Sequence, residues 1–124
     1  MTEIKWLSEP EEHDYPAAAS YLSLIYNWND VNAEKSGLIA KLKSVPVNQF
    51  KAKDIFRASG LPLLDERNSH VRKDKKKIDN GENLSPLLLV RDTNNGKVVI
   101  ADGYHRLCAV YLYDEDAVIP CKIF

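Results

Sequence analysis

Apolar and polar positions alternate along this chain with two different periods, and the first third follows the helical one. The segment 16–26 repeats its apolar residues every three to four positions, and Pro16 suits a first helical turn. A second run, 31–43, follows the capping pair 29–30 and keeps its apolar residues on one face. The pattern therefore predicts two successive helices, the second of them weakened by Gly37.

The rest of the chain mixes extended and helical patterns. Short runs of alternating or wholly apolar residues predict strands at 45–50, 85–91, 97–101 and 119–124. Helical spacing with capping residues predicts helices at 52–59, 70–80 and 103–113. The turn at 94–96, Asn-Asn-Gly, favours a hairpin between its flanking strands. The predicted fold class is α+β, with helices ahead of a strand, strand, helix, strand unit.

Length and net charge restrict the size of the core and the kinds of partner that the chain is expected to have. A chain of 124 residues is long enough to bury one core, and a net charge of −1 creates no global field that would draw in nucleic acid. No apolar run approaches the ~20 residues that span a bilayer, and residues 1–5 do not begin a secretion signal. We therefore expect a cytoplasmic protein without a membrane segment, whose acidic first dozen residues form a loose lead-in.

The two cysteines are candidates for packing rather than for chemistry. Cys108 and Cys121 fall in a predicted buried helix and a closing strand, where reduced core thiols are expected and a disulfide is not. With His105 they supply three soft metal ligands, whereas a structural zinc site needs four. Core packing is the favoured interpretation.

The one bend of the apolar segment "VVIADGYHRLCAV" gathers three side chains that carry chemistry: Asp102, His105 and Arg106. After the bend the helix is apolar on nearly every face, so it is expected to be enclosed, with only its first turn carrying charge. A helix start offers free N–H groups and partial positive charge to phosphate or carboxylate. Gly103 would let a ligand approach the backbone, Arg106 would grip two anionic oxygens, and His105 would add a donor.

A structural interpretation of the same bend stays open beside this one. Asp102 is able to serve as the helix cap, His105 as a core histidine bonded to a carbonyl, and Arg106 as the partner of a surface acid. The carboxylate of Asp102 also repels phosphate. It fits better as a ligand of Mg²⁺ or as the acceptor of a proton from a substrate hydroxyl.

The segments 87–90, 95–97, 100–109 and 119–123 together resemble the ParB/sulfiredoxin superfamily. The shared pattern is a strand pair, a glycine-containing turn that ends in Arg, a short helix with small residues and a closing strand. The resemblance implies a small mixed sheet with helices. It covers residues 45–124, and it predicts that residues 1–44 form a helical extension packed on that domain.

In this superfamily the turn at the helix start binds nucleotide phosphates, and members use ATP, ADP or CTP. The resemblance therefore implies a nucleotide with Mg²⁺, held by the backbone and side chains of Gly103, Tyr104, His105 and Arg106. Asp102 would serve the metal and, with His105, catalysis. Kinase-like members also need an acid near the domain start to deprotonate the acceptor hydroxyl, and Asp54 is the candidate by position, with Asp65 and Glu66 behind it.

Two departures from the family pattern restrict the activities and partners that the resemblance implies. Tyr104 stands where sulfiredoxin-like members carry the catalytic cysteine, which excludes sulfinic acid reduction. No helix-turn-helix follows the matched region, so nucleic acid is not an expected partner. The basic helix around Lys73 and Lys77 either covers bound phosphates or is a solvated face; the interspersed Asp74 and Asp79 favour the latter.

Two hypotheses of different kinds result. The leading one is a domain that binds a nucleotide or another phosphorylated small molecule at residues 102–106, with phosphoryl transfer or NTP hydrolysis as its reaction. The competing one is a non-catalytic accessory or regulatory module that acts through protein contacts. Aromatic residues such as Tyr21, Tyr26 and Trp28 form either a core or the surface of a homodimer. The sequence leaves open whether the chain is an enzyme.

Overall fold

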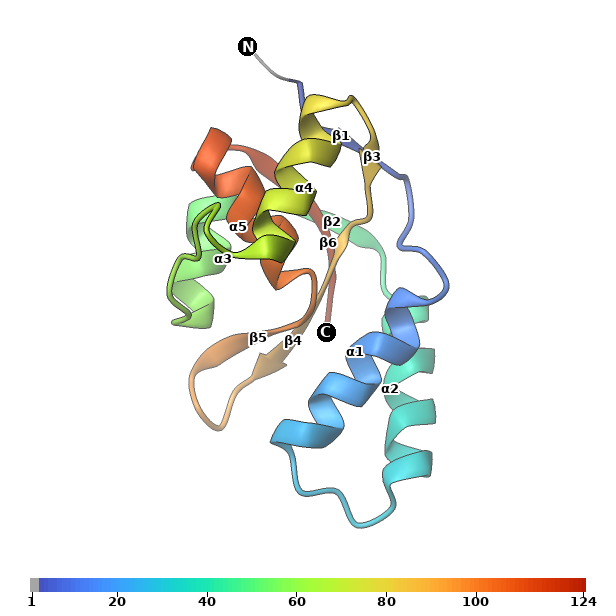
Figure 1. Ribbon diagram of the computed structural model, residues 1–124. Helices are drawn as coiled ribbons and strands as arrows, with labels where there is room; N and C mark the ends of the chain where they lie inside the picture. The colour runs from blue at the N-terminus through green and yellow to red at the C-terminus, as the bar shows by residue number, and fades with distance from the viewer. Residues whose placement is uncertain (1–2) are drawn as a thin grey trace.

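A computed structural model describes residues 3–124 as an α+β fold with five helices and two small sheets (Figure 1). The helices are α1 Asp14–Ile25, α2 Val31–Ser44, α3 Ala52–Ser59, α4 Ser69–Asp79 and α5 Tyr104–Tyr113. The strands are β1 Lys5–Trp6, β2 Val47–Lys51, β3 Asn83–Leu84, β4 Leu87–Asp92, β5 Lys97–Asp102 and β6 Val118–Ile123. Met1 and Thr2, on which part of the secretion-signal interpretation rests, lie outside the described residues.

The predicted fold class is confirmed, and most elements stand within two residues of their predicted bounds. The hairpin is present: β4 pairs with β5 in antiparallel register, and Gly96 has a φ of 64° in the turn between them. The strand predicted at 45–50 begins two residues later, at Val47. No helix among residues 3–124 is long and apolar enough to cross a membrane.

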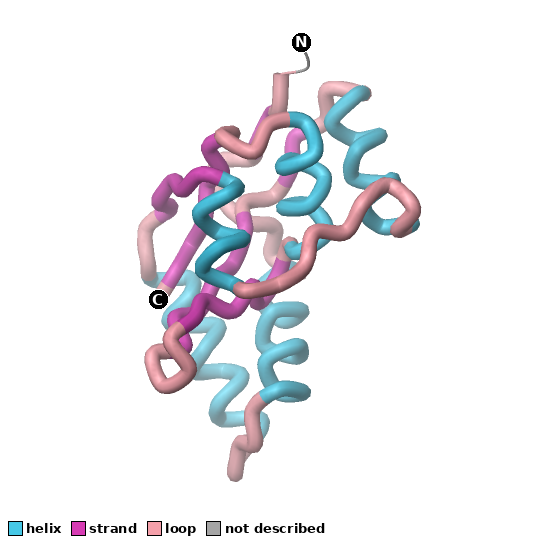
Figure 2. The backbone as a smooth tube through the Cα atoms, turned by 90° about the vertical axis from the view of Figure 1, so that its left-hand side faces the viewer, coloured by secondary structure: helices cyan, strands magenta, loops and turns pink. Residues whose placement is uncertain are grey.

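The larger sheet has the order β2-β6-β4-β5, with β4 and β6 parallel and the other pairs antiparallel. Alternate residues of β4 enter different cores: Leu87 and Leu89 pack with α3, α4 and α5, while Leu88 packs with α1 and α2. Figure 2 shows the strands passing between helices of both groups. Because α1 and α2 bury one face of the sheet, they belong to its packing, while the predicted division into 1–44 and 45–124 stays a prediction.

The acidic lead-in is not loose, contrary to the prediction from its composition. β1 pairs in parallel with β3, and the Leu7 N–H donates to the Leu84 carbonyl oxygen at 2.8 Å. Two residues of strand give too short an alternation to register as a pattern, and the partner strand lies far along the chain. The chain start is thereby attached to the segment that leads into β4.

Candidate functional site

The bend at residues 102–106 joins the end of β5 to the start of α5. Gly103 is the N-cap of α5, with a φ of 109°, and no described side chain caps this helix. A Cβ at Gly103 would lie 2.8 Å from Leu87 Cγ and 2.9 Å from Arg106 Nη2. The glycine is therefore required by the packing of the protein itself, which explains it without the ligand approach that the sequence suggested.

Arg106 is held inside the bend by an ion pair. Its Nη2 donates to Asp102 Oδ2 at 2.8 Å and to the Pro86 carbonyl oxygen at 3.3 Å. The two side chains are only 16% and 19% exposed, and the buried Arg106 Nε has no partner among the described residues. Asp102 is thus not the helix cap that one interpretation made it. It instead fixes Arg106, whose Nη2 is already occupied.

The ion pair does not fill the space next to the bend. A pocket of about 180 Å³, which we call the α5 pocket, lies between the bend and helix α4. It is lined by residues 102–106 and, from α4, by His70, Lys73, Asp74 and Lys77. The structure therefore brings the bend residues singled out in the sequence together with both candidate lysines of the basic helix.

Burial shifts the pKa of three groups that line the α5 pocket. It raises the pKa of Asp102 although the Arg106 guanidinium opposes this, and it raises the pKa of Asp74 against the nearby Lys77. The pKa of His105 is lowered by burial and by His70, whose ring centroid is 4.8 Å away. A lowered pKa keeps the His105 imidazole neutral at pH 7, able to donate one hydrogen bond and accept another.

The pocket lining does not form a metal-binding set. Within residues 3–124 no three His, Cys, Asp or Glu side chains gather where they could hold a metal ion. Asp102, the predicted ligand, already accepts from Arg106. The lining therefore does not fit the predicted Mg²⁺ site. Cys108 and Cys121 are buried free thiols, and burial raises the pKa of Cys121 to about 12, as befits core packing.

Asp54 is not part of the α5 pocket. It lies on α3 beside a separate, mostly apolar pocket of about 250 Å³ between α3 and the sheet. Its carboxylate oxygen is 3.8 Å from Arg57 Nη1, one helical turn away. The predicted role as the acid that activates a hydroxyl at the bend has no support from this placement.

A second hollow adjoins the bend on its other side. It has a volume of about 250 Å³, shares residues 102–105 with the α5 pocket and is lined further by Tyr21, Leu61 and Ile100. The Tyr104 ring also lines it, and the Tyr104 hydroxyl donates to the Pro62 carbonyl oxygen. One turn of backbone thus separates a polar hollow from a largely apolar one.

Comparison with known proteins adds no identity to this geometry. The chain matches no protein-family model, no curated protein and no solved structure. The resemblance to the ParB/sulfiredoxin superfamily accordingly stays a prediction.

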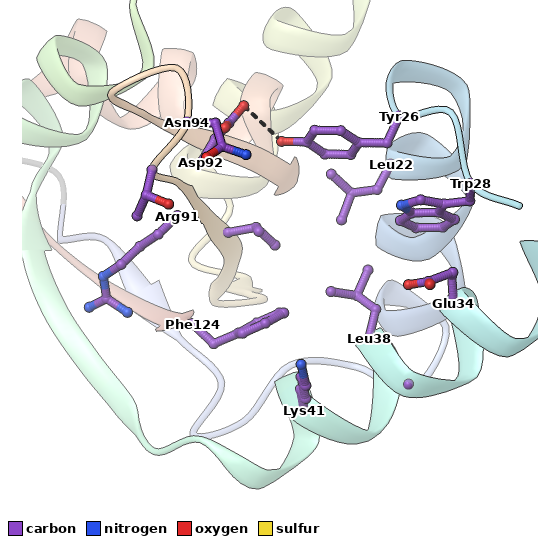
Figure 3. Close-up of a pocket in the computed structure, with 13 residues that line it drawn as sticks. Leu22, Tyr26, Trp28, Glu34, Leu38, Lys41, Arg91, Asp92, Asn94 and Phe124 are labelled. Carbon is purple, nitrogen blue, oxygen red and sulfur yellow. Dashed lines mark hydrogen bonds between the residues drawn. The ribbon is translucent and has the colours of Figure 1, made fainter.

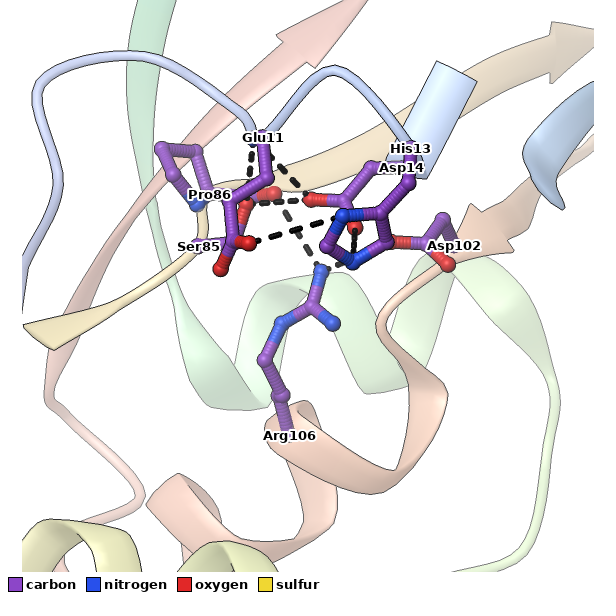
Figure 4. A network of polar contacts seen from close by, with 7 residues as sticks. All are labelled: Glu11, His13, Asp14, Ser85, Pro86, Asp102 and Arg106. Carbon is purple, nitrogen blue, oxygen red and sulfur yellow. Dashed lines mark hydrogen bonds and ion pairs between the residues drawn. The ribbon is translucent and has the colours of Figure 1, made fainter. Parts of the chain in front are cut away.

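Sequence analysis missed a polar cluster on the side of the bend away from α4 (Figure 4). The buried Ser85 hydroxyl donates to Asp14 Oδ2, and the Glu11 amide donates to Ser85 Oγ at 3.1 Å. His13 Nε2 lies 3.3 Å from Asp14 Oδ1. Figure 4 shows this cluster beside the Arg106 guanidinium. The sole signal in the sequence is a polar residue at the start of each apolar run, and Asp14 and Ser85 are 71 positions apart.

Proposed function

We propose that the α5 pocket binds a phosphorylated small molecule, with a nucleotide as its class. The observation that carries the proposal is the convergence of Lys73 and Lys77, from α4, on the pocket where α5 begins without a side-chain cap. The first amides of a helix and nearby ammonium groups are complementary to phosphate oxygens. Neither lysine has a carboxylate partner within 4.0 Å among the described residues.

The balance of charge in the pocket supports an anion. Its lining holds three cationic side chains, Lys73, Lys77 and Arg106. Against them stand two carboxylates, of Asp74 and Asp102, whose ionisation burial disfavours. In this arrangement the lysines neutralise the phosphate, whereas Arg106 positions the bend through Asp102.

The adjoining apolar hollow supports a ligand with a ring. A phosphate group in the α5 pocket would leave the remainder of the molecule close to the bend, where Tyr21, Leu61 and Tyr104 offer apolar surface. Pockets for small molecules combine such surface with a few polar groups that fix orientation. A nucleotide meets both requirements, and inorganic phosphate meets one.

Binding has more support than catalysis. Phosphoryl transfer to a hydroxyl needs a base close to the acceptor, and Asp54 lies at another pocket. The neutral imidazole of His105 is able to accept a proton at pH 7, and His70 brings a second imidazole to the same lining. We therefore propose a binding function and assign His105 as the base if turnover is observed.

A thermal-shift panel tests the proposal. ATP, ADP and CTP, each with Mg²⁺, and phosphate alone are added to the protein, and product formation is followed in parallel. Binding at 100 times Kd corresponds to about 2.7 kcal/mol of stabilisation. We expect a rise in melting temperature with at least one nucleotide and a smaller rise with phosphate.

Lysine variants supply the matched control. Lys77→Ala removes a charge at the pocket, whereas Lys76→Ala removes the same charge from the exposed neighbouring position. The first is expected to weaken nucleotide binding about fivefold to tenfold, as loss of a charge-assisted hydrogen bond does. Equal effects of the two variants, or no shift with any nucleotide, would show that the proposal is wrong.

A second candidate function rests on helix α1. Tyr21, Leu24 and Ile25 share one helical face by their spacing and are exposed, Leu24 to 84%. Such a face favours the accessory hypothesis or a homodimer. Sedimentation of the protein and of Leu24→Ser at several concentrations tests it: a dimer that the substitution dissociates supports this candidate, and a concentration-independent monomer excludes the homodimer.

A further inference from the structure

Another pocket, which shares no lining residue with the bend, lies between α2, the end of α1 and the β4–β5 hairpin. We call it the α2 pocket; its volume is about 330 Å³. Figure 3 shows Trp28 and Phe124 on opposite sides of it, with Leu22 and Leu38 between them. A hollow with aromatic walls and an apolar floor is suited to a planar ring.

Gly37 leaves open space on the α2 side of this hollow. It lies in the interior of α2 and lines the pocket, and a Cβ built there would meet nothing within 4 Å. Glycine in a helix interior costs about 1 kcal/mol relative to alanine. No neighbouring atom requires a residue without a side chain here, so a larger side chain at position 37 would enter the pocket.

The charged groups around the α2 pocket determine which ligand it suits. Lys41 Nζ lies 5.3 Å from the centre of the Phe124 ring and, within residues 3–124, has no carboxylate within 4.0 Å. Asp92, another carboxylate of the lining, accepts from the Tyr26 hydroxyl at 2.9 Å and from Asn95 Nδ2 at 2.9 Å and forms no ion pair with Lys41. Lys41 is thus a cation without a carboxylate partner at a hollow whose lining is partly apolar and partly polar, and Arg91 is a second cation of that lining.

Glu34 fixes the direction in which a ligand would lie. It is in the first turn of α2, where the helix dipole favours a carboxylate, and Lys41 is two turns further along the same helix. Seven residues correspond to roughly 10 Å of helix. Both line the pocket, so its Glu34 end repels an anionic group and its Lys41 end attracts one.

From these observations we infer that the α2 pocket binds a small aromatic anion, a planar ring that carries one carboxylate. The ring lies between Trp28 and Phe124 over the space that Gly37 leaves free. The carboxylate pairs with the Lys41 ammonium. This site is independent of the phosphate site proposed at the bend.

Three indole probes of one shape and different charge test the inference: indole-3-acetate, the neutral alcohol tryptophol and the cation tryptamine. Binding is followed by titration calorimetry and by the NMR shift of the Gly37 amide. We expect indole-3-acetate to bind most tightly and to shift that amide. Lys41→Gln should weaken its binding about fivefold to tenfold, whereas Glu34→Gln should not weaken it.

Variants at Gly37 locate the site. Gly37→Leu fills the hollow and should abolish binding, and Lys77→Ala, at the α5 pocket, should leave it unchanged. Circular dichroism checks that each variant folds; Lys41→Gln alters an exposed side chain and keeps the test decisive if Gly37→Leu does not fold. The inference is overturned if tryptophol or tryptamine binds as well as indole-3-acetate, if none of the probes binds, or if Lys41→Gln has no effect.

Discussion

Two glycines, one at each pocket, differ in what they do for the protein. Gly103 has a positive φ, and Leu87 and Arg106 fill the space where its side chain would be. Gly37 is helical and faces open space. The first glycine is explained by the fold, whereas the second is not. The comparison teaches that a small residue points to a ligand only after the demands of internal packing have been excluded.

The carboxylates of the two pockets also differ, in how well the protein stabilises their negative charge. Asp102 lies in a bend so enclosed that burial raises its pKa despite its ion pair with Arg106. Asp92 accepts hydrogen bonds from Asn95 and from Tyr26, and these hold its pKa below the usual range. At the α5 pocket, burial destabilises the charged form of Asp102 despite its ion pair. At the α2 pocket, hydrogen bonds stabilise the charged form of Asp92.

The largest effect is expected from Gly103→Ala. A side chain there combines a left-handed backbone with contacts of 2.8 Å and 2.9 Å to Leu87 and Arg106, and we expect a loss of about 3 kcal/mol in the free energy of unfolding. Urea denaturation measures it. Gly96→Ala is the matched control, since Gly96 has a φ of 64° but open space around it, and it should cost only about 1 kcal/mol. Equal losses would refute the packing explanation.

Arg106→Ala is expected to destabilise the protein in the absence of any ligand. It leaves the 19% exposed Asp102 without its partner and removes the bond to the Pro86 carbonyl. The expected loss is about 2 to 3 kcal/mol, again by urea denaturation. The double variant with Asp102→Asn should recover part of this loss, because no uncompensated charge remains. A loss seen solely when nucleotide is present would mean that Arg106 serves the ligand instead.

The fold was largely predictable because most of its elements carry a local signal. Helix α3 matches its predicted bounds, 52–59, since an amphipathic run ends there at Gly60, whose φ of 69° suits a helix C-cap. The strands β1 and β3 were not predicted. Each is two residues long, and each exists through the other, some 78 positions away along the chain.

The candidate site was predictable in its members but not in its contacts. The bend residues were singled out because charge in an apolar segment is visible in a sequence, and Lys73 because it belongs to a run of basic residues. The partner of Arg106 was not evident, since Asp102 ends β5 and the turn at Gly103 is what brings it to the first turn of α5. The α2 pocket was even less predictable. In the sequence, Gly37 indicates only a less stable helix, and the space beside it is evident only in the structure.

Titration should separate the two carboxylates by the sign of their pKa shifts. Carboxyl carbon NMR is expected to show Asp102 titrating above its ordinary pKa and Asp92 below it. The stability that Asp92 contributes is therefore present above the ordinary carboxyl pKa and lost as the pH falls through the lowered one. For Asp102 the sign is opposite, so stability is lost as the pH rises through the raised pKa. Shifts of equal sign would contradict the comparison.

The same titration of the Arg106→Ala variant tests whether the ion pair between Asp102 and Arg106 forms in solution. Because the Arg106 guanidinium lowers the pKa of Asp102 against the effect of burial, its removal should raise that pKa further and leave Asp92 unchanged. An unchanged Asp102 would mean that the ion pair is not formed in solution.

The smallest effect, and one of opposite sign, is expected from Gly37→Ala. A helical φ and open space mean that alanine adds no strain and restricts the unfolded chain, so the free energy of unfolding should rise by about 0.5 to 1 kcal/mol. The methyl group should at the same time weaken indole-3-acetate binding, because it enters the space reserved for the ring. Thermal unfolding and calorimetry measure the two changes. A variant that gains stability and keeps full affinity would show that Gly37 is merely a weak point of α2, and the contrast between the two glycines would then say nothing about ligands.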